Sequence, residues 1–561
     1  MPSIRWLGPV RIAGRLGAAA VFLLVAAAAS AEAAPVAERI GDRIVRFFES
    51  EEARAAAGPS IALERPQPAL GPAPENFIVQ PIFQILQNRN AVRVRVEEGT
   101  SLYGTGEVPG PLLRSGRRTT LWNFDAYGWD DDAAHLYQSH PWVLAVRRDG
   151  TSFGLLFDTT WRSHIDLAGD ILFLSDGPPF AVIAIERDSP AEVVRALAEL
   201  TGRMPLPPLW ALGYHQCRYS YFPDERLREI GREFRNRDIP CDVLWADIDY
   251  MDAYRSFTFH PTRFPDPLGL NEDLHGRGFR TVWILDPGIL AEDGYGIYDS
   301  GREKRVWVER QGGEPYTGRV WPGTCVFPDF TNSVARAWWA DLVSGFLGSG
   351  ADGVWIDMNE PAIFDVWEKT MPLSSVHRAD AALGGPDTHA RYHNVYGMLM
   401  ARATREGMAA ARPNTRPFVL TRANHLGGQR EAASWSGDNR ADWYHLDASI
   451  PTVLNLGLSG QPFSGADIGG FAGDGDGDLF ARWMGIGALL PFARGHSEKG
   501  TIDKEPWAFG PEVEAVCREA LRRRYRLLPY LYTVFREASV TGLPVARPLF
   551  FADPADATLR A

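Results

Sequence analysis

The stretch "GVWIDMNEPAIF", residues 353–364, decides the fold because it joins a short apolar run to a cluster of polar groups. Four apolar or small residues precede Asp357, and Asn359 and Glu360 follow within three positions. An apolar run of this length predicts a buried strand. A carboxylate at the end of such a strand adds nothing to its packing, so Asp357 indicates a site where the strand ends.

Seven further stretches have the same apolar character, and helix-like segments such as "DERLREIGREFRNR" and "VARAWWADLVSGFL" lie between them. Eight strands that alternate with helices predict an α/β fold, a (β/α)8 barrel over residues 199–545. The active site of such a barrel lies at the carboxyl ends of its strands. The predicted strands are residues 211–217, 241–251, 280–289, 353–359, 417–423, 433–439, 462–471 and 490–496.

Ionisable side chains stand at seven of these eight strand ends. A single Asp after a strand is as often a helix cap or a loop anchor as a functional group. A whole set at one end of a barrel would cost stability unless the groups met a ligand or one another, which proteins accept chiefly at functional sites. The set comprises Asp247, Asp249, Asp286, Asp357, Arg422, Asp438, Asp467, Arg494 and His496.

The residue types in this set favour carboxylate chemistry. His496 is the one imidazole at a predicted strand end, and the paired Cys and His ligands typical of zinc sites do not occur in the pattern. No G-x-S-x-G motif for a nucleophilic serine occurs at a strand-to-helix turn. An oxygen-ligand metal site of Asp357, Asn359 and Glu360 stays open, although the aromatic neighbour Trp355 suits a sugar better than hydrated Mg²⁺. The simplest function for these carboxylates is that two of them flank a glycosidic bond. We expect neither a metal nor a cofactor.

The repeat "GDGDGDLF", residues 473–480, is similar to a calcium-binding loop. The EF-hand pattern requires Gly at its sixth position and Glu at its twelfth, where this chain has Leu479 and Gly485. We therefore expect a loop in which Asp478 caps the following helix.

The N-terminal part of the chain has a different pattern. Between residues 76 and 188, short runs such as "AVRVRVEE" and "DILFLSD" are separated by Gly and Asp turns, which predicts a small antiparallel β-sandwich. Residues 35–75 are rich in Ala, Glu and Pro and are expected to form a loose lead-in, so that this domain spans residues 35–198. The stretch "SPAEVVRALAELTGR" predicts a helix that begins at Pro190 and is capped by Ser189.

Residues 1–34 have the features of a signal peptide. Arg5, Arg11 and Arg15 precede a short apolar run, and small residues at Ala29 and Ala31 offer a cleavage site. The run is shorter than the roughly 20 apolar residues that a membrane-spanning helix needs. We therefore expect an exported protein, periplasmic or extracellular, without stable membrane insertion.

The net charge of −12 is spread along the chain without a basic run, so nucleic acid is not an expected partner. Nothing in the pattern indicates the oligomeric state. Four cysteines are too few and too scattered for a disulfide scaffold or a CxxC metal site, and we expect buried free thiols. They are Cys217, Cys241, Cys325 and Cys517.

Several motifs resemble those of glycoside hydrolase family 31, the retaining α-glucosidases and their relatives. Besides residues 353–364 they are "LYGTGE", "LWALGYHQCRYSY", "VLWADIDYMDAYRSFTF", "WPGTCVFPDFTN", "HNVYG", "SWSGDN", "SGADIGGF" and "PFARGH". They occur in the order and approximate spacing of the family, from about residue 75 onward. The resemblance implies a galactose mutarotase-like N-terminal domain, a catalytic barrel and an α-linked oligosaccharide as substrate.

The resemblance also implies roles for individual residues. Asp357 corresponds to the nucleophile and Asp438 to the acid/base of a double displacement that returns the α anomer. Substrate-binding positions are Asp247, Arg422, His496, Trp321, Trp355, Trp435, Ile289, Met358, Phe471 and Tyr219. Supporting positions are Asp286, Asp467, Arg494 and Glu360.

Two matters stay open in the sequence. Family members usually continue into C-terminal β domains, so residues 546–561 are expected to be the start of a truncated one, and a non-catalytic sugar-binding remnant is the alternative to an enzyme. The specificity is also open, because α-xylosidases, sulfoquinovosidases and transglucosidases share the nucleophile. Ala246 stands where asparagine is frequent, and loops such as residues 366–388 determine the linkage preference.

Overall fold

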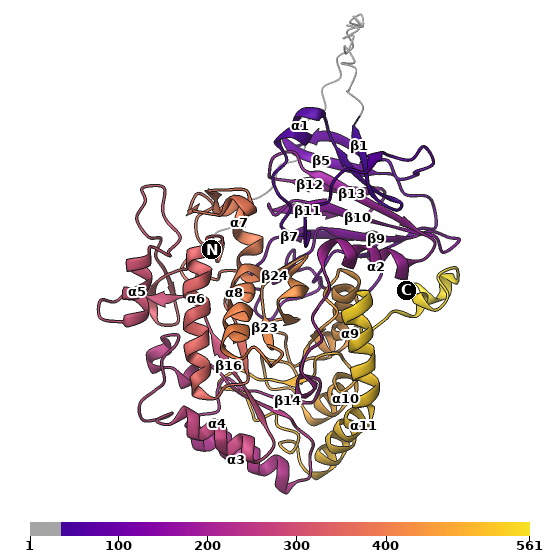
Figure 1. Ribbon diagram of the computed structural model, residues 1–561. Helices are drawn as coiled ribbons and strands as arrows, with labels where there is room; N and C mark the ends of the chain where they lie inside the picture. Colours follow the sequence, from indigo (N-terminus) through magenta and orange to yellow (C-terminus); the bar gives the residue numbers. More distant parts are fainter. Residues whose placement is uncertain (1–34) are drawn as a thin grey trace, which may run out of the picture. The chain divides into compact units, whose positions relative to one another are not determined.

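Two antiparallel sheets and a parallel barrel make up residues 35–561, the part of the chain that the computed structural model describes (Figure 1). The predicted signal peptide, residues 1–34, lies outside the described residues. Within residues 35–561, no helix combines the length and the apolar character needed to cross a bilayer.

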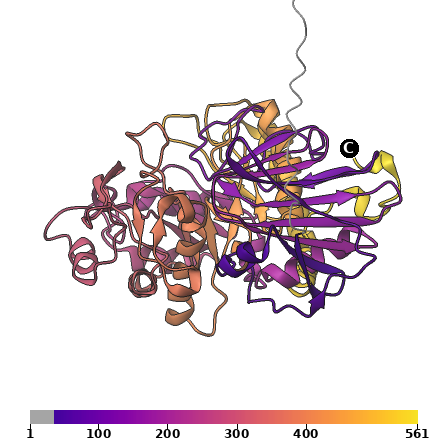
Figure 2. The same cartoon turned by 90° about the horizontal axis from the view of Figure 1, so that it is seen from above.

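The antiparallel sheets form the predicted β-sandwich at the N-terminal end of the described chain (Figure 2). Apolar side chains of the two sheets pack on one another, and the rings of Phe157 and Phe173 stack with centroids 4.1 Å apart. Burial of this apolar surface holds the sheets together. The first sheet has the order β3 (Gly71–Pro72), β1 (Val36–Gly41), β2 (Ile44–Phe48), β13 (Ala181–Arg187), β10 (Ser152–Asp158), β9 (Trp142–Val146), β6 (Ser101–Gly104), and the second the order β4 (Ile82–Leu86), β5 (Arg89–Val94), β12 (Ile171–Ser175), β11 (Ser163–Asp166), β7 (Arg118–Leu121).

The expectation that residues 35–75 form a loose lead-in is wrong. β1 and β2 form a hairpin with Val36 opposite Phe48, and β2 also pairs with β13. Val45 and Phe47 are buried in the core between the two sheets. The segment "VAERIGDRIVRFF", residues 36–48, carries two short apolar runs around a Gly-Asp turn, which is a hairpin pattern. The polar residues after it concealed the strand pair.

The parallel strands form a nearly closed barrel, and each of the eight predicted stretches contains a barrel strand. The order is β26 (Ser464–Gly465), β25 (Ala433–Trp435), β23 (Val419–Thr421), β20 (Gly353–Ile356), β16 (Arg280–Leu285), β15 (Val243–Ala246), β14 (His215–Gln216), β28 (Arg494–Gly495) and β27 (Asp467–Ile468). The seventh predicted stretch contains two of these strands, because β26 pairs with β25 whereas β27 pairs with β28. The barrel therefore closes through one strand that is interrupted at Ala466.

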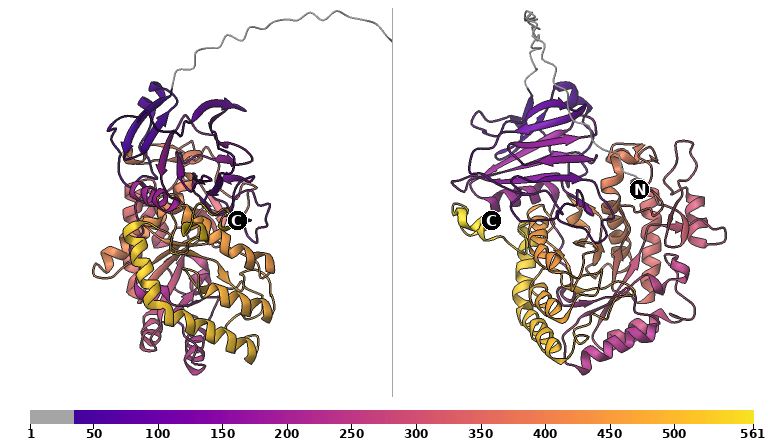
Figure 3. Two further views of the ribbon diagram at one scale, coloured as in Figure 1. Left: turned by 90° about the vertical axis from the view of Figure 1, so that its right-hand side faces the viewer. Right: turned by 180° about the vertical axis from the view of Figure 1, so that it is seen from behind.

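Helices cover the outside of the barrel, with α10 and α11 along one side (Figure 3). Those between or after the strands are α3 (Asp224–Asn236), α4 (Pro267–Gly276), α6 (Ser333–Phe346), α8 (Tyr396–Ala411), α9 (Trp443–Leu458), α10 (Gly477–Gly487) and α11 (Pro511–Thr541). Smaller elements in the connections include α5 (Gly296–Lys304), β17 (Ile289–Leu290), β18 (Gly318–Val320), β19 (Gly323–Val326), β21 (Val376–His377), β22 (Asp387–Thr388) and α7 (His389–Tyr392).

One of the two predicted helix caps is confirmed. Ser189 accepts a hydrogen bond from the backbone N–H of Glu192 at the start of α2 (Pro190–Thr201). The predicted cap of α10 is wrong, because Asp476 accepts from the Leu479 N–H at 2.9 Å and the helix begins at Gly477. Asp478 lies in the first turn instead, where its negative charge interacts favourably with the positive end of the helix dipole.

The sandwich and the barrel are joined by hydrogen bonds between distant parts of the chain. β8 (Gln138–Ser139), which follows the sandwich strand β7, pairs in parallel with β24 (Asn424–His425), which follows the barrel strand β23. Trp142 Nε1 donates to the Leu458 carbonyl at 3.0 Å, so β9 also contacts the end of α9. The segment of residues 122–137 is thereby held against the carboxyl ends of the barrel strands.

Residues 546–561 pack against the sandwich. They contain two 3₁₀ turns, η8 (Leu549–Phe551) and η9 (Ala557–Leu559). The rings of Phe550 and Tyr103 stack with centroids 4.4 Å apart, and Arg560 donates to the Arg147 carbonyl at 2.7 Å. The assignment of these residues to the start of a β domain stays a prediction.

Candidate active site

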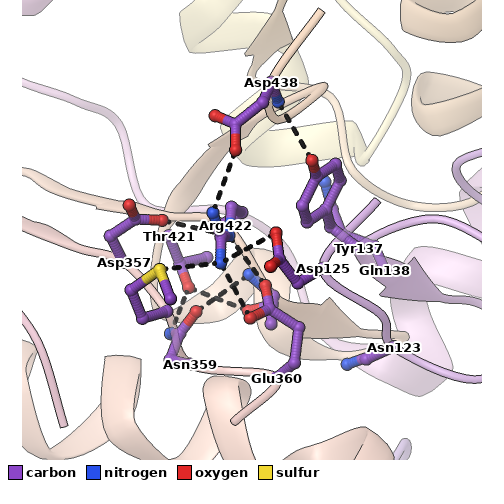
Figure 4. A network of polar contacts seen from close by, with 12 residues as sticks. Asn123, Asp125, Tyr137, Gln138, Asp357, Asn359, Glu360, Thr421, Arg422 and Asp438 are labelled. Atoms are coloured by element: carbon purple, nitrogen blue, oxygen red, sulfur yellow. Dashed lines mark hydrogen bonds and ion pairs between the residues drawn. The ribbon is translucent and has the colours of Figure 1, made fainter. Parts of the chain in front are cut away.

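Arg422 lies at the centre of a buried network at the carboxyl ends of the barrel strands (Figure 4). Its Nε is 3.0 Å from Asp357 Oδ1, and its Nη1 donates to Asp438 Oδ2 at 3.2 Å. Two further bonds, of 2.8 and 3.0 Å, join the guanidinium to both oxygens of Glu360. One cation therefore holds both predicted catalytic carboxylates, which approach it from different sides.

Short apolar strands place these side chains. Asp357 directly follows β20, whose four residues are all buried, and Arg422 directly follows β23. After Asp357 the chain turns sharply at Met358, which has a φ of 55°, a conformation that non-glycine residues rarely adopt. Met358 Sδ accepts a hydrogen bond from Arg422 Nη2 at 3.2 Å. Such strain is typical of functional sites, where the surrounding contacts enforce it.

The structure does not favour the alternative of an oxygen-ligand metal site at Asp357, Asn359 and Glu360. The side-chain oxygens of Glu360 and Asn359 already accept hydrogen bonds from protein groups. Both oxygens of Glu360 accept from Arg422. Asn359 accepts from the Ala423 N–H at 3.0 Å and donates to Thr421 Oγ1 at 3.0 Å. Glu360 and Asn359 therefore fix the β20 and β23 ends to each other, and this supports the predicted supporting role of Glu360.

Two residues of the network come from the sandwich side of the chain and were missed in the sequence. Asp125 Oδ1 lies 3.7 Å from Arg422 Nη2, and the ring of Tyr137 lies 5.0 Å from the guanidinium carbon. The Tyr137 hydroxyl accepts from the Asp438 N–H at 3.3 Å, and the Gly128 N–H donates to the Asp438 carbonyl at 2.8 Å. The segment "LWNFDAYGWDDDAAHLYQ", residues 121–138, is rich in acidic and aromatic residues without strand alternation, which could have indicated a functional loop.

The network carries more carboxylates than its single guanidinium can neutralise. Burial raises the pKa of Asp357, and the Arg422 charge opposes that rise. Burial also raises the pKa of Asp438 well above its usual range, opposed by Arg422 and reinforced by the charge of Asp357. Two carboxyl groups whose pKa values are both raised, beside one cation, can hold a proton between them, and a nucleophile with an acid requires one ionised and one protonated group.

A second buried pair lies deeper in the barrel. Arg494 Nε and Nη2 donate to the two oxygens of Asp467 at 2.8 and 3.0 Å, and neither side chain is exposed. The guanidinium carbon lies 4.8 to 4.9 Å from the rings of Trp245, Trp355 and Trp435. This pair therefore fixes the positions of Trp355 and Trp435, consistent with the predicted supporting role of Asp467 and Arg494.

Asp247 and His496 face each other beside this pair, with Asp247 Oδ2 3.7 Å from His496 Nε2. Burial raises the pKa of Asp247 well above its usual range. Burial, together with the Arg494 charge, lowers the pKa of His496 well below its usual range, so the ring is neutral. The Phe471 ring packs on the His496 ring with centroids 4.8 Å apart. This group can offer both hydrogen-bond donors and acceptors to the hydroxyl groups of a sugar.

The remaining predicted residues differ in their exposure. Trp321 is 38% exposed and packs edge-on against Tyr219, with centroids 6.1 Å apart, at the rim of the strand ends. Asp286 is buried after β16, and its Oδ1 has no hydrogen-bond partner within residues 35–561. Ile289 is fully buried in β17, where it pairs with Val326 of β19. Its place in the pocket wall stays a prediction.

Comparisons with known proteins agree with this architecture. Residues 204–534 match the glycosyl hydrolases family 31 TIM-barrel domain, and residues 86–166 match the glycosyl hydrolase 31 N-terminal galactose mutarotase-like domain. The chain is 44% identical to alpha-glucosidase 2 of Bacillus thermoamyloliquefaciens over 82% of this chain and 58% of that protein. It is 36% identical to the lysosomal alpha-glucosidase of Mus musculus over 86% of this chain and 53% of that protein, so it spans little more than half the length of these relatives.

Two solved structures extend the comparison. The family 31 alpha-glucosidase from Bacteroides thetaiotaomicron has a TM-score of 0.78 and 53% identity, over 84% of this chain and 78% of that one. A dextranase from Flavobacterium johnsoniae has a TM-score of 0.83 and 27% identity, over 93% of this chain and 70% of that one. The resemblance drawn from the motifs is confirmed, and the chain belongs to glycosyl hydrolase family 31.

Proposed function

We propose that the protein is a retaining α-glucosidase that hydrolyses terminal, non-reducing α-linked glucose from oligosaccharides. The observation that carries the proposal is the contact of Asp357 and Asp438 with the same guanidinium, that of Arg422. The pair lies among buried aromatic rings at the carboxyl end of a barrel, where enzymes of this fold have their active sites. The alpha-glucosidases of known name at up to 53% identity support the substrate class.

In the first step, a carboxylate oxygen of Asp357 attacks the anomeric carbon as the bond to the leaving oxygen breaks. Asp438 donates its proton to that oxygen, and a glycosyl ester forms on Asp357. Arg422 keeps Asp357 ionised until substrate arrives. In the second step, Asp438 removes a proton from water, the water oxygen attacks the same carbon, and Asp357 leaves. Two inversions return the α anomer.

The sugar would be held by Asp247 and His496, whose buried polar atoms need partners that a glucose ring can supply. Trp355, Trp435, Met358 and Phe471 surround this region, and Trp321 with Tyr219 forms the rim at which the leaving sugar would sit. Aromatic faces suit the apolar faces of pyranose rings.

The activity is tested by assaying the purified chain on maltose, isomaltose and an aryl α-xyloside beside Asp357→Ala. We expect release of glucose from the first two, and a loss of about 10⁵-fold or more in kcat on removal of the nucleophile. Equal rates for both proteins would contradict the assignment. Isomaltose is included because one similar structure is a dextranase, and preferential action on the xyloside would move the protein to another activity of the family.

The stereochemistry provides a separate test. Following the first product by NMR, before mutarotation, should show α-glucose. An initial β-glucose would exclude the double displacement even if hydrolysis occurred.

We further propose that residues 1–34 direct export, on the basis of the Arg-rich start, the apolar run and the small residues before Pro35. The test is N-terminal sequencing of protein from the extracytoplasmic fraction. A start near residue 34 or 35 is expected, and an intact N-terminus in the cytoplasm would contradict export.

A further inference from the structure

Cys217, Asp247 and His496 form a cluster at the ends of three adjacent barrel strands. They follow β14, β15 and β28, which are neighbours in the barrel although the residues lie far apart in the sequence. One ligand atom of each lies within 4.8 Å of those of the other two. All three residues are at most 5% exposed. The cluster is therefore a preformed group of sulfur, oxygen and nitrogen donors.

The contacts within the cluster leave these donors available. Asp247 Oδ2 and His496 Nε2 are 3.7 Å apart, too far for a hydrogen bond. The Cys217 sulfur lies beside the backbone N–H of Arg218. Cys241, which is equally buried, instead directs its thiol to the carbonyls of Tyr214 and Val243 at 3.4 and 3.5 Å.

The spacing suits a tetrahedral ion. With zinc bonds of about 2.3 Å to sulfur and about 2.0 to 2.2 Å to nitrogen and oxygen, tetrahedral ligand atoms lie about 3.3 to 3.6 Å apart. The Asp247 and His496 atoms are already close to this separation. Three protein ligands leave the fourth position for water, and the thiolate selects borderline or soft cations over Mg²⁺.

The surrounding charges are compatible with a cation. The positive charges that act on His496 are those of Arg494, Arg218 and Lys504. Arg494 is already paired with Asp467, and Arg218 lies 3.6 Å from Asp503. Asp357 lies close enough for its charge to act on Asp247. A divalent ion would therefore enter beside Asp247 and near Asp357, while the two arginines already have carboxylate partners.

We propose that Cys217, Asp247 and His496 bind a thiophilic divalent cation such as Zn²⁺, and that the bound ion blocks the substrate pocket. Asp247 and His496 cannot ligate the ion and hold sugar hydroxyls at the same time, so the ion and the sugar compete. The blocking rests on the proposed glycosidase function, whereas binding of the ion does not. The pattern was not evident in the sequence because the three ligands come from separate strands.

Binding is tested by calorimetric titration of the purified protein with Zn²⁺, with Mg²⁺ as the hard-cation comparison. One Zn²⁺ per chain is expected for the wild type and for the control Cys241→Ser. Cys217→Ser should bind at least about tenfold more weakly, the scale that even the loss of an outer-shell partner produces. Co²⁺ should give the visible absorption of a tetrahedral thiolate site in the control but not in Cys217→Ser. Equal affinities in the two variants, or equal binding of Mg²⁺, would overturn the site.

Blocking is tested by measuring hydrolysis at several Zn²⁺ concentrations, with each variant normalised to its own rate without metal. In the wild type and in Cys241→Ser, the apparent KM should rise with the Zn²⁺ concentration while kcat stays constant. In Cys217→Ser, the apparent KM should not rise over the same range. If Zn²⁺ binds at Cys217 without changing the KM of an active enzyme, the blocking is wrong. If every form binds as expected but none hydrolyses the substrates, the proposed function fails and the metal site stands.

Discussion

Two buried arginines in the barrel meet their carboxylates in opposite ways. Arg494 has one partner, Asp467, which takes two parallel hydrogen bonds, and tryptophan rings enclose the pair. Arg422 lies within 4 Å of four carboxylates, those of Asp125, Asp357, Glu360 and Asp438. Charge is balanced around Arg494 and unbalanced around Arg422.

The difference separates structural from chemical use of the same residue types. In a fully buried ion pair with one partner on each side, the charged groups satisfy each other and do not bind a ligand. Such a pair holds the neighbouring side chains in position. An excess of carboxylates around one cation raises carboxyl pKa values and leaves at least one group ready to carry a proton. Substitutions at four residues test this difference between the two arginines.

The largest effect is expected at the unbalanced arginine, from Asp438→Asn. The amide keeps the shape but cannot protonate the leaving oxygen, so kcat/KM on maltose should fall by about 10²- to 10⁴-fold. The loss should be smaller on an aryl α-glucoside, whose leaving group needs less protonation. Thermal unfolding should change little. Equal losses of kcat/KM on both substrates would show that Asp438 is not the general acid.

At the balanced arginine, Arg494→Met should act on folding instead. It leaves the Asp467 carboxylate buried without a partner, which costs about 3–5 kcal/mol of stability. The double variant Arg494→Met/Asp467→Leu should recover much of that loss, because neither charge is then left alone. Denaturant unfolding of wild type and both variants measures this. A double variant as unstable as the single one would show that the pair is not an isolated structural unit.

Arg422→Met should shift the pH profile. Arg422 lowers the pKa of Asp357 against the effect of burial, so its removal raises that pKa further. Asp357 must be ionised to attack, and the acid limb of kcat/KM should therefore move to higher pH, by about 1 unit or more. Lys369→Met is the matched control, since Lys369 Nζ contacts Asp125 rather than Asp357. A limb that moves equally in both variants would contradict the special role of Arg422.

The smallest effect is expected from Tyr137→Phe, which removes the hydroxyl that accepts the Asp438 N–H. A single neutral hydrogen bond is worth about 0.5–1.5 kcal/mol, so kcat should fall by about 2- to 13-fold with little change in KM. Tyr103→Phe is the control, because its buried hydroxyl donates to the Arg560 carbonyl far from the network. Equal kcat values for the two variants would show that the Tyr137 hydroxyl does not position Asp438.

The barrel could be predicted from the sequence because its signals are local. Runs such as residues 353–356 are apolar on both faces, as parallel strands require, and seven of the eight predicted strands end at an ionisable residue. The network around Asp357, Arg422 and Asp438 follows from this, since the strand ends of a barrel meet. The confirmed family resemblance rests on the same residues.

The rest depended on contacts between distant segments. Asp125 and Tyr137 reach Arg422 because β8 pairs with β24, and no local pattern predicts that pairing. The division of one strand at Ala466 depends on how the barrel closes. The hairpin of β1 and β2 was missed for a different reason: its pattern was present, but the polar composition of the following residues outweighed it.

The position of residues 122–137 in the sequence also limits how early during synthesis the complete site can form. Asp125 is synthesised roughly 300 residues before Asp438, and at about 5–20 residues per second the interval is about 15–60 s. During that time the sandwich can fold, but the partner of its loop does not yet exist. A growing chain that has not yet reached Asp438 therefore has no complete Arg422 network, however early the sandwich folds.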